Sequence, residues 1–484
     1  MVQDLRPLVV VTNREPYEDV LTATGWQTIQ RAGGVTAALD PVMQATGGEW
    51  IAWGSGSADR LAAPDGVRRV PPTRPRYRLH RVDLSAREVA GYYAGYANQG
   101  LWPLSHLLVE RARFRQADWE QYRRVNRRFA ETVAERAPVG ARVFTHDYHL
   151  TLVPELVRRL RPDVALAHFW HIPWAPWRVF RLCPQRDIIL RGLLGADVLG
   201  FQTPADREAF VTAAEQAVGA VADGEGWVRW EGRRIRVGVF PVTVDARAIA
   251  AEVSDPRLAA WIRGVRRRLA PGGRRLVVSV DRADYTKGIL ARLAGVEAFF
   301  AHHPEHRGQV TFVQVVVPTR LDVPEYRELF DRILAESDRI NARFASGRWQ
   351  PLVTVRRAVD RRRVLGLLAA ADIGLVTSLY DGMNLVAKEF VASHVDEDGV
   401  LLVSQSAGAA DELDEALRVN PLDPDGMALA IGAALAMPAA ERRRRMRRMR
   451  AYLMRYGSIE WLHAILEALD EAVLARDALG VPAR

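Results

Sequence analysis

The segment VVSVDRADYTKGIL, residues 277–290, decides the fold. Its apolar run Leu276–Val280 predicts a short buried strand, and the apolar pattern that starts after Gly288 predicts a helix. Short apolar runs alternate with amphipathic stretches along nearly the whole chain. This order predicts an α/β fold, with parallel sheets that are covered by helices on both faces.

The other expected strands share the same short, continuous apolar pattern. In the first half they are Leu8–Thr12, Trp50–Ala52, Val143–His146, Ala165–Trp170 and Val198–Phe201, and in the second half Val310–Val317, Leu352–Val355, Ile373–Thr377, Val400–Ser404 and Leu417–Asn420. An apolar recurrence at three and four residues predicts a helix over Asp322–Phe344. The stretch GEGWVRWEGRR, residues 224–234, is typical of a small hairpin.

The chain of 484 residues is long enough for two domains. A new strand–helix series begins after Arg236–Ala246, so we expect two doubly wound domains with a cleft between them. The expected domains are residues 1–240 and 241–458. Residues 459–484 would form a last helix that crosses back to the first domain.

Composition excludes several classes of protein. Hydrophobic residues make up 49% and charged residues 26%, as in ordinary globular proteins and unlike disordered or fibrous chains. The sequence contains no apolar run of the roughly 18–20 residues that a membrane span needs, and its first residues do not resemble a signal peptide. The single cysteine, Cys183, excludes an internal disulfide, so we expect a cytoplasmic protein and no membrane partner.

The formal net charge of +9 is compatible with an anionic partner. The most basic run is ERRRRMRRMR, residues 441–450, in which Met446 and Met449 are three residues apart. We interpret it as a solvated helix face and expect no nucleic-acid partner, because no aromatic residues interleave with the arginines. Only two of the 67 basic residues are lysines, Lys287 and Lys388.

The loop after the strand Leu276–Val280 carries Arg282, Asp284 and Lys287. Parallel α/β sheets bind ligands beyond the carboxyl ends of their strands, so both cations are placed to hold a diphosphate and to stabilise it as it leaves. The alternative is a surface loop with an Arg–Asp pair.

A second motif is LVTSLYDGMNLVAKEF, residues 375–390. We expect a tight turn at Asp381–Gly382 and a helix that begins at Met383, whose free amides suit phosphate or sugar oxygens. Glu389 could accept two hydrogen bonds from a ribose diol. An ordinary turn followed by a helical glutamate is the alternative.

The first half also carries polar residues at expected strand ends. Asp147 and His149 follow one strand and His171 the next, although a lone histidine there is more often packed than catalytic. Arg14 follows the first strand, and Gly33–Gly34 opens a helical pattern that could approach a phosphate. Tyr92, Tyr93 and the stretch NQGLWPL, residues 98–104, could form an aromatic sugar platform or belong to the core.

The sequence lacks a G-x-x-x-x-G-K-[ST] loop, a G-x-G-x-x-G loop, a cysteine cluster, H-E-x-x-H and G-x-S-x-G. The NTPase, dinucleotide, zinc and serine-hydrolase readings therefore lose support. It also lacks a compact pair of acids suited to a catalytic divalent metal, so we expect no metal site and no cofactor.

Taken together, the motifs resemble the trehalose-6-phosphate synthase family of retaining glycosyltransferases. In order from about residue 8 to 460, they are THDYHL (145–150), HIPW (171–174), LGFQT (199–203), VDRADYTKG (280–288), PTRLDV (318–323), RINARF (339–344), DGMNLVAKE (381–389) and SQSAGAADEL (404–413). The resemblance implies a GT-B fold, in which two Rossmann-like domains face each other. The first domain would hold the acceptor sugar phosphate and the second the nucleotide-sugar.

The resemblance also implies a role for each matching residue. The catalytic residues would be Arg282, Lys287, His171 and Asp147. The donor would be bound by Gly34, His171, Arg282, Lys287, Asp381, Met383, Asn384, Leu385, Val386 and Glu389. The acceptor would be bound by Arg14, Trp53, Tyr93, Trp102, Asp147 and Arg320.

The family's reaction moves glucose from a nucleoside diphosphate (UDP, GDP or ADP) to glucose 6-phosphate and gives α,α-trehalose 6-phosphate. The opening NREPYEDV, residues 13–20, is also similar to glucosylglycerol-phosphate synthases, which use glycerol 3-phosphate. Where trehalose-type enzymes often read T-P-L-R, this chain has Thr377, Ser378, Leu379 and Tyr380. The sequence does not decide which nucleoside base the donor carries. It also does not decide whether the protein forms a homo-oligomer.

Overall fold

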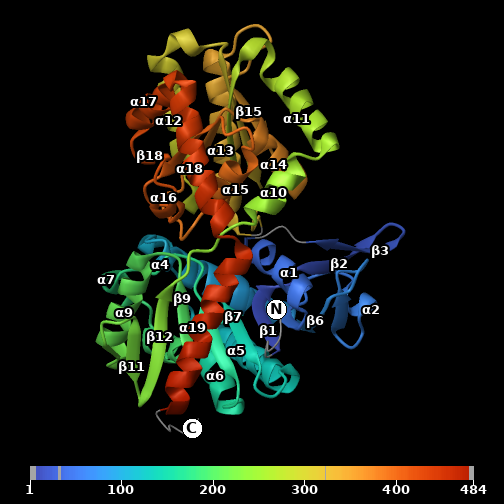
Figure 1. Cartoon of the computed structure of the whole chain (residues 1–484), viewed down its shortest axis with the longest axis vertical. Coiled ribbons are helices and arrows are strands. Elements are labelled where there is room, and N and C mark those ends of the chain that lie inside the picture. Colours follow the sequence, from blue (N-terminus) through green and yellow to red (C-terminus); the bar gives the residue numbers. More distant parts are fainter. Residues whose placement is uncertain (1–6, 31–33, 322, 479–484) are drawn as a thin grey trace. The chain divides into compact units, whose positions relative to one another are not determined.

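The computed structural model describes residues 7–30, 34–321 and 323–478 (Figure 1). The chain divides into two compact units: unit 1 combines the residues up to Val242 with those from Ser458 onward, and unit 2 is Thr243–Gly457. Each unit is built around its own largely parallel sheet. No described helix is both long and apolar enough to cross a membrane.

The described residues of unit 1 form a ten-stranded sheet in the order β10-β11-β12-β9-β8-β7-β1-β4-β6-β5. The neighbours from β12 to β6 pair in parallel, and antiparallel strands complete each edge. The strands are β1 (Leu8–Arg14), β4 (Glu49–Trp53), β5 (Val67–Val70), β6 (Tyr77–Val82), β7 (Arg142–His146), β8 (Ala165–Phe169), β9 (Val198–Phe201), β10 (Val221–Ala222), β11 (Trp227–Trp230) and β12 (Arg233–Val239). A separate hairpin pairs β2 (Tyr17–Thr22) with β3 (Gly25–Gln30).

Helices connect these strands. They are α1 (Gly34–Thr46), α2 (Asp59–Ala62), α3 (Ala86–Glu88), a π-helix η1 (Val89–Leu101), α4 (Trp102–Ser105), a 3₁₀ turn η2 (Val109–Arg111), α5 (Gln116–Arg136), α6 (Val153–Leu160), α7 (Trp177–Phe180), α8 (Arg186–Leu194), α9 (Pro204–Val218) and α19 (Ser458–Ala478). The inner strands β7, β8 and β9 are buried at every residue. Burial of successive residues requires cover on both faces of the sheet, as the sequence pattern predicts.

Unit 2 has a sheet of six described strands, all parallel, in the order β15-β14-β13-β16-β17-β18. The strands are β13 (Arg275–Arg282), β14 (Val310–Val317), β15 (Leu352–Val355), β16 (Ile373–Val376), β17 (Val400–Ser404) and β18 (Leu417–Val419). The helices are α10 (Ala246–Val253), α11 (Pro256–Leu269), α12 (Ile289–His302), α13 (Pro324–Phe344), α14 (Arg361–Ala370), α15 (Leu385–Ser393), α16 (Ala409–Glu412), α17 (Pro424–Ala436) and α18 (Ala439–Arg455), with 3₁₀ turns η3 (Pro271–Gly273), η4 (Tyr285–Lys287) and η5 (Pro304–His306).

One core of unit 2 lies between the sheet and the helices α12, α13 and α17. Phe299 and Phe300 of α12, Ile333 of α13 and Met427 of α17 are fully buried there. At Gly295 of α12, an added Cβ would lie 2.4 Å from the Met427 sulfur. The absence of a side chain at Gly295 therefore allows α12 and α17 to pack closely.

Helix α19 packs on the sheet of unit 1, against β12, β8 and β9 (Figure 1). Its Trp461 indole donates a hydrogen bond of 2.9 Å to the Phe240 carbonyl, and Asp470 pairs with Arg142 at 2.6 Å. The helix thus contributes to the hydrogen bonding and burial of unit 1 although unit 2 precedes it in the chain.

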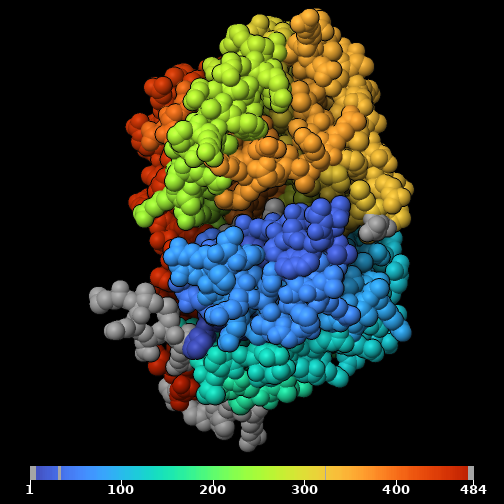
Figure 2. Space-filling view, turned by 90° about the vertical axis from the view of Figure 1, so that its right-hand side faces the viewer, coloured from blue at the N-terminus to red at the C-terminus, as the bar shows by residue number. Residues whose placement is uncertain are grey.

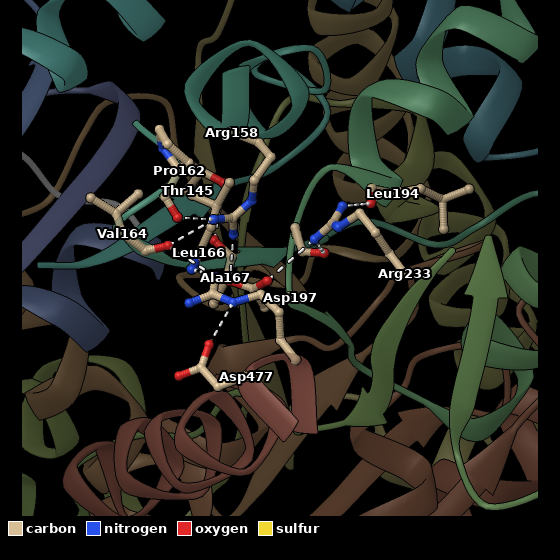
Figure 3. Close-up of polar contacts among 12 residues, drawn as sticks. Thr145, Arg158, Pro162, Val164, Leu166, Ala167, Leu194, Asp197, Arg233 and Asp477 are labelled. Atoms are coloured by element: carbon tan, nitrogen blue, oxygen red, sulfur yellow. Dashed lines mark hydrogen bonds and ion pairs between the residues drawn. The ribbon is translucent and has the colours of Figure 1, made fainter. Parts of the chain in front are cut away.

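A second contact of α19 centres on the buried Asp197 (Figure 3). Arg158 and Arg233 lie 2.5 and 3.2 Å from its carboxylate, and Arg476 of α19 lies 3.5 Å away. The arginines also donate to backbone carbonyls, for example that of Val164. Because carbonyl oxygens take up these donors, we interpret the cluster as a structural connection rather than as an anion site.

The arginine-rich run lies on α18. Met446 and Met449 are buried, and most of the arginines pair with acidic side chains of the same unit. Arg442 lies 2.6 Å from Asp398, and Arg448 lies 2.6 Å from Glu415. The cationic face of this helix is therefore largely neutralised within unit 2.

Two differences from the expected elements have clear causes. The strands β5 and β6 were not predicted, because arginines interrupt their apolar residues, as in VRRV and YRLHRV. The β2–β3 hairpin was not predicted, because most of β3 is exposed. Figure 2 shows these early segments of unit 1, in blue, gathered on one face.

The helix expected to begin at Met383 begins instead at Leu385. Asn384 has a φ of 100° and caps the helix, since its side-chain oxygen accepts a hydrogen bond from the Ala387 amide. Met383 therefore lies in the loop before the helix. The helix expected to begin at Asp322 begins at Pro324, and Asp322 lies outside the described residues.

Candidate active site

In unit 2 the loop after β13 lies against the end of β16. Gly288 has a φ of 61°, and an added Cβ would lie 2.1 Å from the Thr377 carbonyl oxygen. Only glycine fits such a position without strain. This close approach brings the Arg282–Lys287 loop next to the Asp381 turn, as expected for the carboxyl ends of neighbouring parallel strands.

Lys287 and Asp381 form the central pair at this end of the unit 2 sheet. The Lys287 ammonium lies 2.5 Å from the Asp381 carboxylate, which also accepts hydrogen bonds from Ser378 at 2.9 Å and from Asn384 at 3.1 Å. Burial opposes ionisation of Asp381, but the Lys287 charge and these hydrogen bonds keep its pKa below the usual value. The loop is therefore held in one geometry by a network around a single carboxylate oxygen.

Arg282 is the last residue of β13 and is exposed. Asp284, buried two residues later, accepts hydrogen bonds from the Thr286 amide and hydroxyl, both at 3.0 Å. Arg320 reaches the same carboxylate at 3.5 Å and also donates to the Tyr326 hydroxyl. The structure thus places Arg320 in unit 2, whereas the other predicted acceptor residues lie in unit 1.

Helix α15 carries the predicted donor residues Leu385, Val386 and Glu389. Leu385 and Val386 form its first turn, where helix amides point outward from the N-terminus. Burial raises the pKa of Glu389 to about 7, although Arg361, whose Nε lies 4.0 Å away, opposes this shift. Glu389 is thus half-ionised near neutral pH.

In unit 1 the predicted acceptor residues Arg14, Trp53 and Tyr93 touch one another. The Arg14 guanidinium donates to the Tyr93 hydroxyl at 2.9 Å and lies 4.8 Å from the Tyr93 ring centroid and 5.3 Å from that of Trp53. Tyr93 stacks in turn on His149, with ring planes 14° apart. A guanidinium has five N–H donors, so its bond to Tyr93 leaves others that could bind a phosphate.

Trp102 is buried, and its ring centroid lies 5.7 Å from that of Tyr148. Tyr148 donates to Asn98 at 2.8 Å, and Asn98 donates to the Tyr93 carbonyl. Trp102 is therefore connected to the Arg14 cluster through buried side chains. The aromatic residues of this region are partly core and partly site.

Asp147 and His171 follow the adjacent parallel strands β7 and β8. The Asp147 amide donates to the Phe169 carbonyl at 2.7 Å, and its carboxylate lies 3.3 Å from the His171 amide. Burial lowers the pKa of His171 to about 3, so its ring is neutral at physiological pH. A neutral imidazole can donate one hydrogen bond and accept another.

Backbone strain marks several of the predicted site residues. Among the described residues other than glycine, six have positive φ: Leu107, Asp147, Glu231, Arg320, Asn384 and Glu397. Three of these, Asp147, Arg320 and Asn384, belong to the predicted site. Such conformations are costly for residues with a Cβ and tend to gather at functional sites.

The remaining predictions concern Gly34 and a metal site. Gly34 is the exposed first residue of α1, and Gly33 lies outside the described residues. Across the described ranges, no group of three or more His, Cys, Asp or Glu side chains is arranged to hold a metal ion.

Sequence reasoning missed three contributors. His146, the last residue of β7, lies with its Nδ1 3.0 Å from the His171 Nε2. Ser378 supports Asp381, and the π-helix η1 carries Tyr93. Only the position of His146 directly before Asp147, at a strand end, could have suggested it, since strand pairing brings it to His171.

The family model of glycosyltransferase family 20 matches residues 6–471. A bifunctional trehalose-6-phosphate synthase/phosphatase of Thermoproteus tenax is 38% identical over 97% of this chain, which spans only 64% of that protein's length. A trehalose-6-phosphate synthase of a Mycobacterium species (strain KMS) is 36% identical over 96% of this chain and 95% of its own.

Among solved structures, a UDP-forming α,α-trehalose-phosphate synthase from Burkholderia xenovorans, in complex with glucose-6-phosphate, is similar. The TM-score is 0.87 at 33% sequence identity, and the match covers 96% of this chain and 100% of that one. This likeness confirms the predicted α/β, GT-B fold class, and the family match confirms the resemblance seen in the motifs. The chain belongs to glycosyltransferase family 20.

Proposed function

We propose that the protein is a retaining glucosyltransferase that moves glucose from a nucleoside diphosphate to glucose 6-phosphate and so makes α,α-trehalose 6-phosphate. The observation that carries the proposal is the Lys287–Asp381 network at the carboxyl end of β13, in a chain that matches trehalose-6-phosphate synthases over nearly its whole length. The glucose-6-phosphate complex of the UDP-forming relative supports this acceptor and makes UDP-glucose the first donor to test.

On the donor side, Lys287 would neutralise the leaving diphosphate together with Arg282. The ammonium has three hydrogens, so its bond to Asp381 leaves donors for phosphate oxygens. Backbone groups of Met383–Val386 would add hydrogen bonds to the phosphates and the glucose, with Gly34 as a further contact. Glu389 would accept hydrogen bonds from the ribose hydroxyls.

On the acceptor side, the stacked Arg14 would bind the sugar phosphate together with Tyr93, Trp102 and Arg320. Trp53 and Asp147 would contact the acceptor sugar, and His171 the glucose near its anomeric carbon. Neutral His171 suits hydroxyl groups, which both donate and accept hydrogen bonds. The charge of Arg14 suits a phosphate.

The transfer balances without a cofactor or metal. The bond between the glucose anomeric carbon and the diphosphate oxygen breaks, and a bond to the anomeric oxygen of glucose 6-phosphate forms on the same face. The acceptor's hydroxyl proton passes to the leaving diphosphate. Positive charge at Arg282 and Lys287 stabilises the developing anion, a type of contribution worth on the order of 3–4 kcal/mol for one donor.

The deciding experiment mixes the purified protein with UDP-, GDP- or ADP-glucose and with glucose 6-phosphate or glycerol 3-phosphate. We expect trehalose 6-phosphate, identified by mass and by two α-anomeric proton signals in NMR. A product formed only from glycerol 3-phosphate would instead identify a glucosylglycerol-phosphate synthase. Tight binding of the nucleotide-sugar without any product would show a binding protein.

A further inference from the structure

His146 ends strand β7, and His171 lies two residues after the end of the adjacent parallel strand β8. The two rings share one hydrogen bond. His146 Nδ1 lies 3.0 Å from His171 Nε2, and the ring centroids are 5.2 Å apart. Phe144 and Phe169 pack on the two rings at centroid distances of 4.0 and 4.6 Å. This aromatic packing fixes the orientation of both imidazoles.

Both rings are neutral at physiological pH, because burial holds the pKa of each well below its usual value. The neighbouring His168 shifts the pKa of His146 in the same direction. Exactly one of the two facing nitrogens must therefore carry the shared proton, since two neutral rings cannot both donate or both accept across one hydrogen bond.

The surroundings of His146 decide which nitrogen donates. His146 is buried, and its Nε2 has no hydrogen-bond partner among the described residues. A proton on Nε2 would leave a buried N–H without an acceptor, which is rarer in proteins than an unsatisfied acceptor. A proton on Nδ1 instead donates to His171 Nε2, and His171 then carries its own proton on Nδ1.

We propose that His146 is a positioning residue that fixes His171 in the Nδ1–H tautomer. This inference rests on the proposed function for its consequence: His171 would present a hydrogen-bond donor, not an acceptor, to a substrate oxygen. It also gives a role to the buried histidine that ends β7. Fixing a tautomer through the second ring nitrogen is a general means of controlling histidine chemistry.

The tautomer can be read without turnover. In protein labelled with ¹⁵N-histidine, two-bond ¹H–¹⁵N correlation spectra distinguish a protonated from a bare ring nitrogen. We expect His171 to be protonated at Nδ1 in the wild-type protein and to revert to the Nε2–H form, which free imidazole side chains favour, in His146→Leu. A wild-type His171 protonated at Nε2, or an unchanged tautomer in His146→Leu, would overturn the proposal.

His168→Leu is the matched control. His168 is also a buried neutral histidine of β8, but its Nδ1 lies 2.8 Å from the Thr145 hydroxyl rather than from His171. We expect the His171 tautomer to be the same in this variant as in the wild type. A tautomer change of equal size in both variants would show a general packing effect and would contradict the specific role of His146.

His146→Asn tests the role by rescue, because the asparagine side-chain nitrogen can occupy the place of Nδ1. We expect kcat to fall by about 10- to 100-fold in His146→Leu and to recover to within about threefold of wild type in His146→Asn. Equal losses in the two variants would overturn the proposal. A wild-type protein inactive with every donor and acceptor would refute the proposed function, whereas the tautomer result would still decide the role of His146.

Discussion

The two units use the same architectural position for different chemistry. In unit 2 the carboxyl ends of the strands carry a network of charges around Asp381, with Lys287 2.5 Å away. In unit 1 they carry neutral histidines and an arginine stacked on aromatic rings. Fixed charge suits a group whose charge grows during the reaction, and a stacked cation with neutral rings suits a substrate that must be bound and oriented.

We expect the largest effect when the fixed positive charge of unit 2 is removed. Lys287→Ala should lower kcat by about 100- to 1,000-fold, because the leaving diphosphate loses a cation and Asp381 loses its partner. Initial rates at saturating donor and acceptor measure this effect, with Arg268→Ala on the exposed face of α11 as the control. A rate near that of wild type, in a variant with unchanged circular dichroism, would refute the role of Lys287.

The second prediction tests the binding role of unit 1. Arg14→Ala should raise KM for the sugar phosphate by about 10- to 100-fold and change kcat less, because a charge-assisted hydrogen bond contributes about 1.5–3 kcal/mol. Arg14→Lys keeps the charge but loses the fork and the stacking, so it should recover only part of the affinity. A loss confined to kcat would instead place Arg14 in the chemical step.

A third, smaller effect concerns the support of Asp381. Ser378→Ala removes one of the hydrogen bonds to its carboxylate, while Lys287 and Asn384 remain. We expect kcat/KM to fall by about three- to tenfold. Ser254→Ala, which removes a hydroxyl that donates to the Ala250 carbonyl of its own helix, should leave kcat/KM unchanged. Equal rates in the two variants would contradict the structural role of Ser378.

A fourth prediction concerns pH. Because burial raises the pKa of Glu389 to about 7, this carboxyl loses its proton as the pH rises through neutrality. The ionised form accepts hydrogen bonds from a ribose diol better, so KM for the donor should fall by about three- to tenfold between about pH 6 and about pH 8. If KM for the donor depends on pH in the same way in Glu389→Gln as in the wild type, Glu389 is not the cause of that dependence.

The raised pKa also predicts a change in stability. The folded protein binds the Glu389 proton more tightly than the unfolded chain, so stability falls as the pH rises from the usual pKa of 4.5 to about 7, and the loss is constant above that. Glu389→Gln should therefore raise the melting temperature at about pH 8 and have no such effect near pH 4. The opposite sign would show that the carboxylate is stabilised in the folded state.

The smallest expected effect is none. If Arg282 and Lys287 supply the positive charge, incubation with EDTA followed by assay in metal-free buffer should leave turnover within about 1.5-fold of the untreated enzyme. Loss of activity that Mg²⁺ or Mn²⁺ restores would contradict metal independence.

The sequence predicted the inner parallel strands well, because burial on both faces leaves an uninterrupted apolar run. Val310–Val317 and Val400–Ser404 match the structure to the residue. The edge strand Val67–Val70 and its neighbour Tyr77–Val82 were missed, since arginines interrupt their apolar residues. Where one face of a strand carries arginine, the sequence pattern is hard to distinguish from that of a loop.

The site divides in the same way. Its strand-end residues follow from topology alone, so Lys287 and Asp381 could be placed together in advance. The contact between His146 and His171 depends on side-chain directions, and the positive φ of Asn384 gives no sign in a residue other than glycine. For that reason the predicted start of α15, at Met383, was wrong.

The return of α19 to unit 1 has a consequence for synthesis on the ribosome. Unit 2 is one uninterrupted stretch, whereas unit 1 is completed only when the residues from Ser458 onward have been translated. At about 5–20 residues per second, the nascent unit 1 waits roughly 10–45 s for that helix. Until then Phe144 and Phe169 lack Trp461, whose ring centroid lies 5.9 and 5.3 Å from theirs in the folded protein, so these rings stay without that cover until the helix is made.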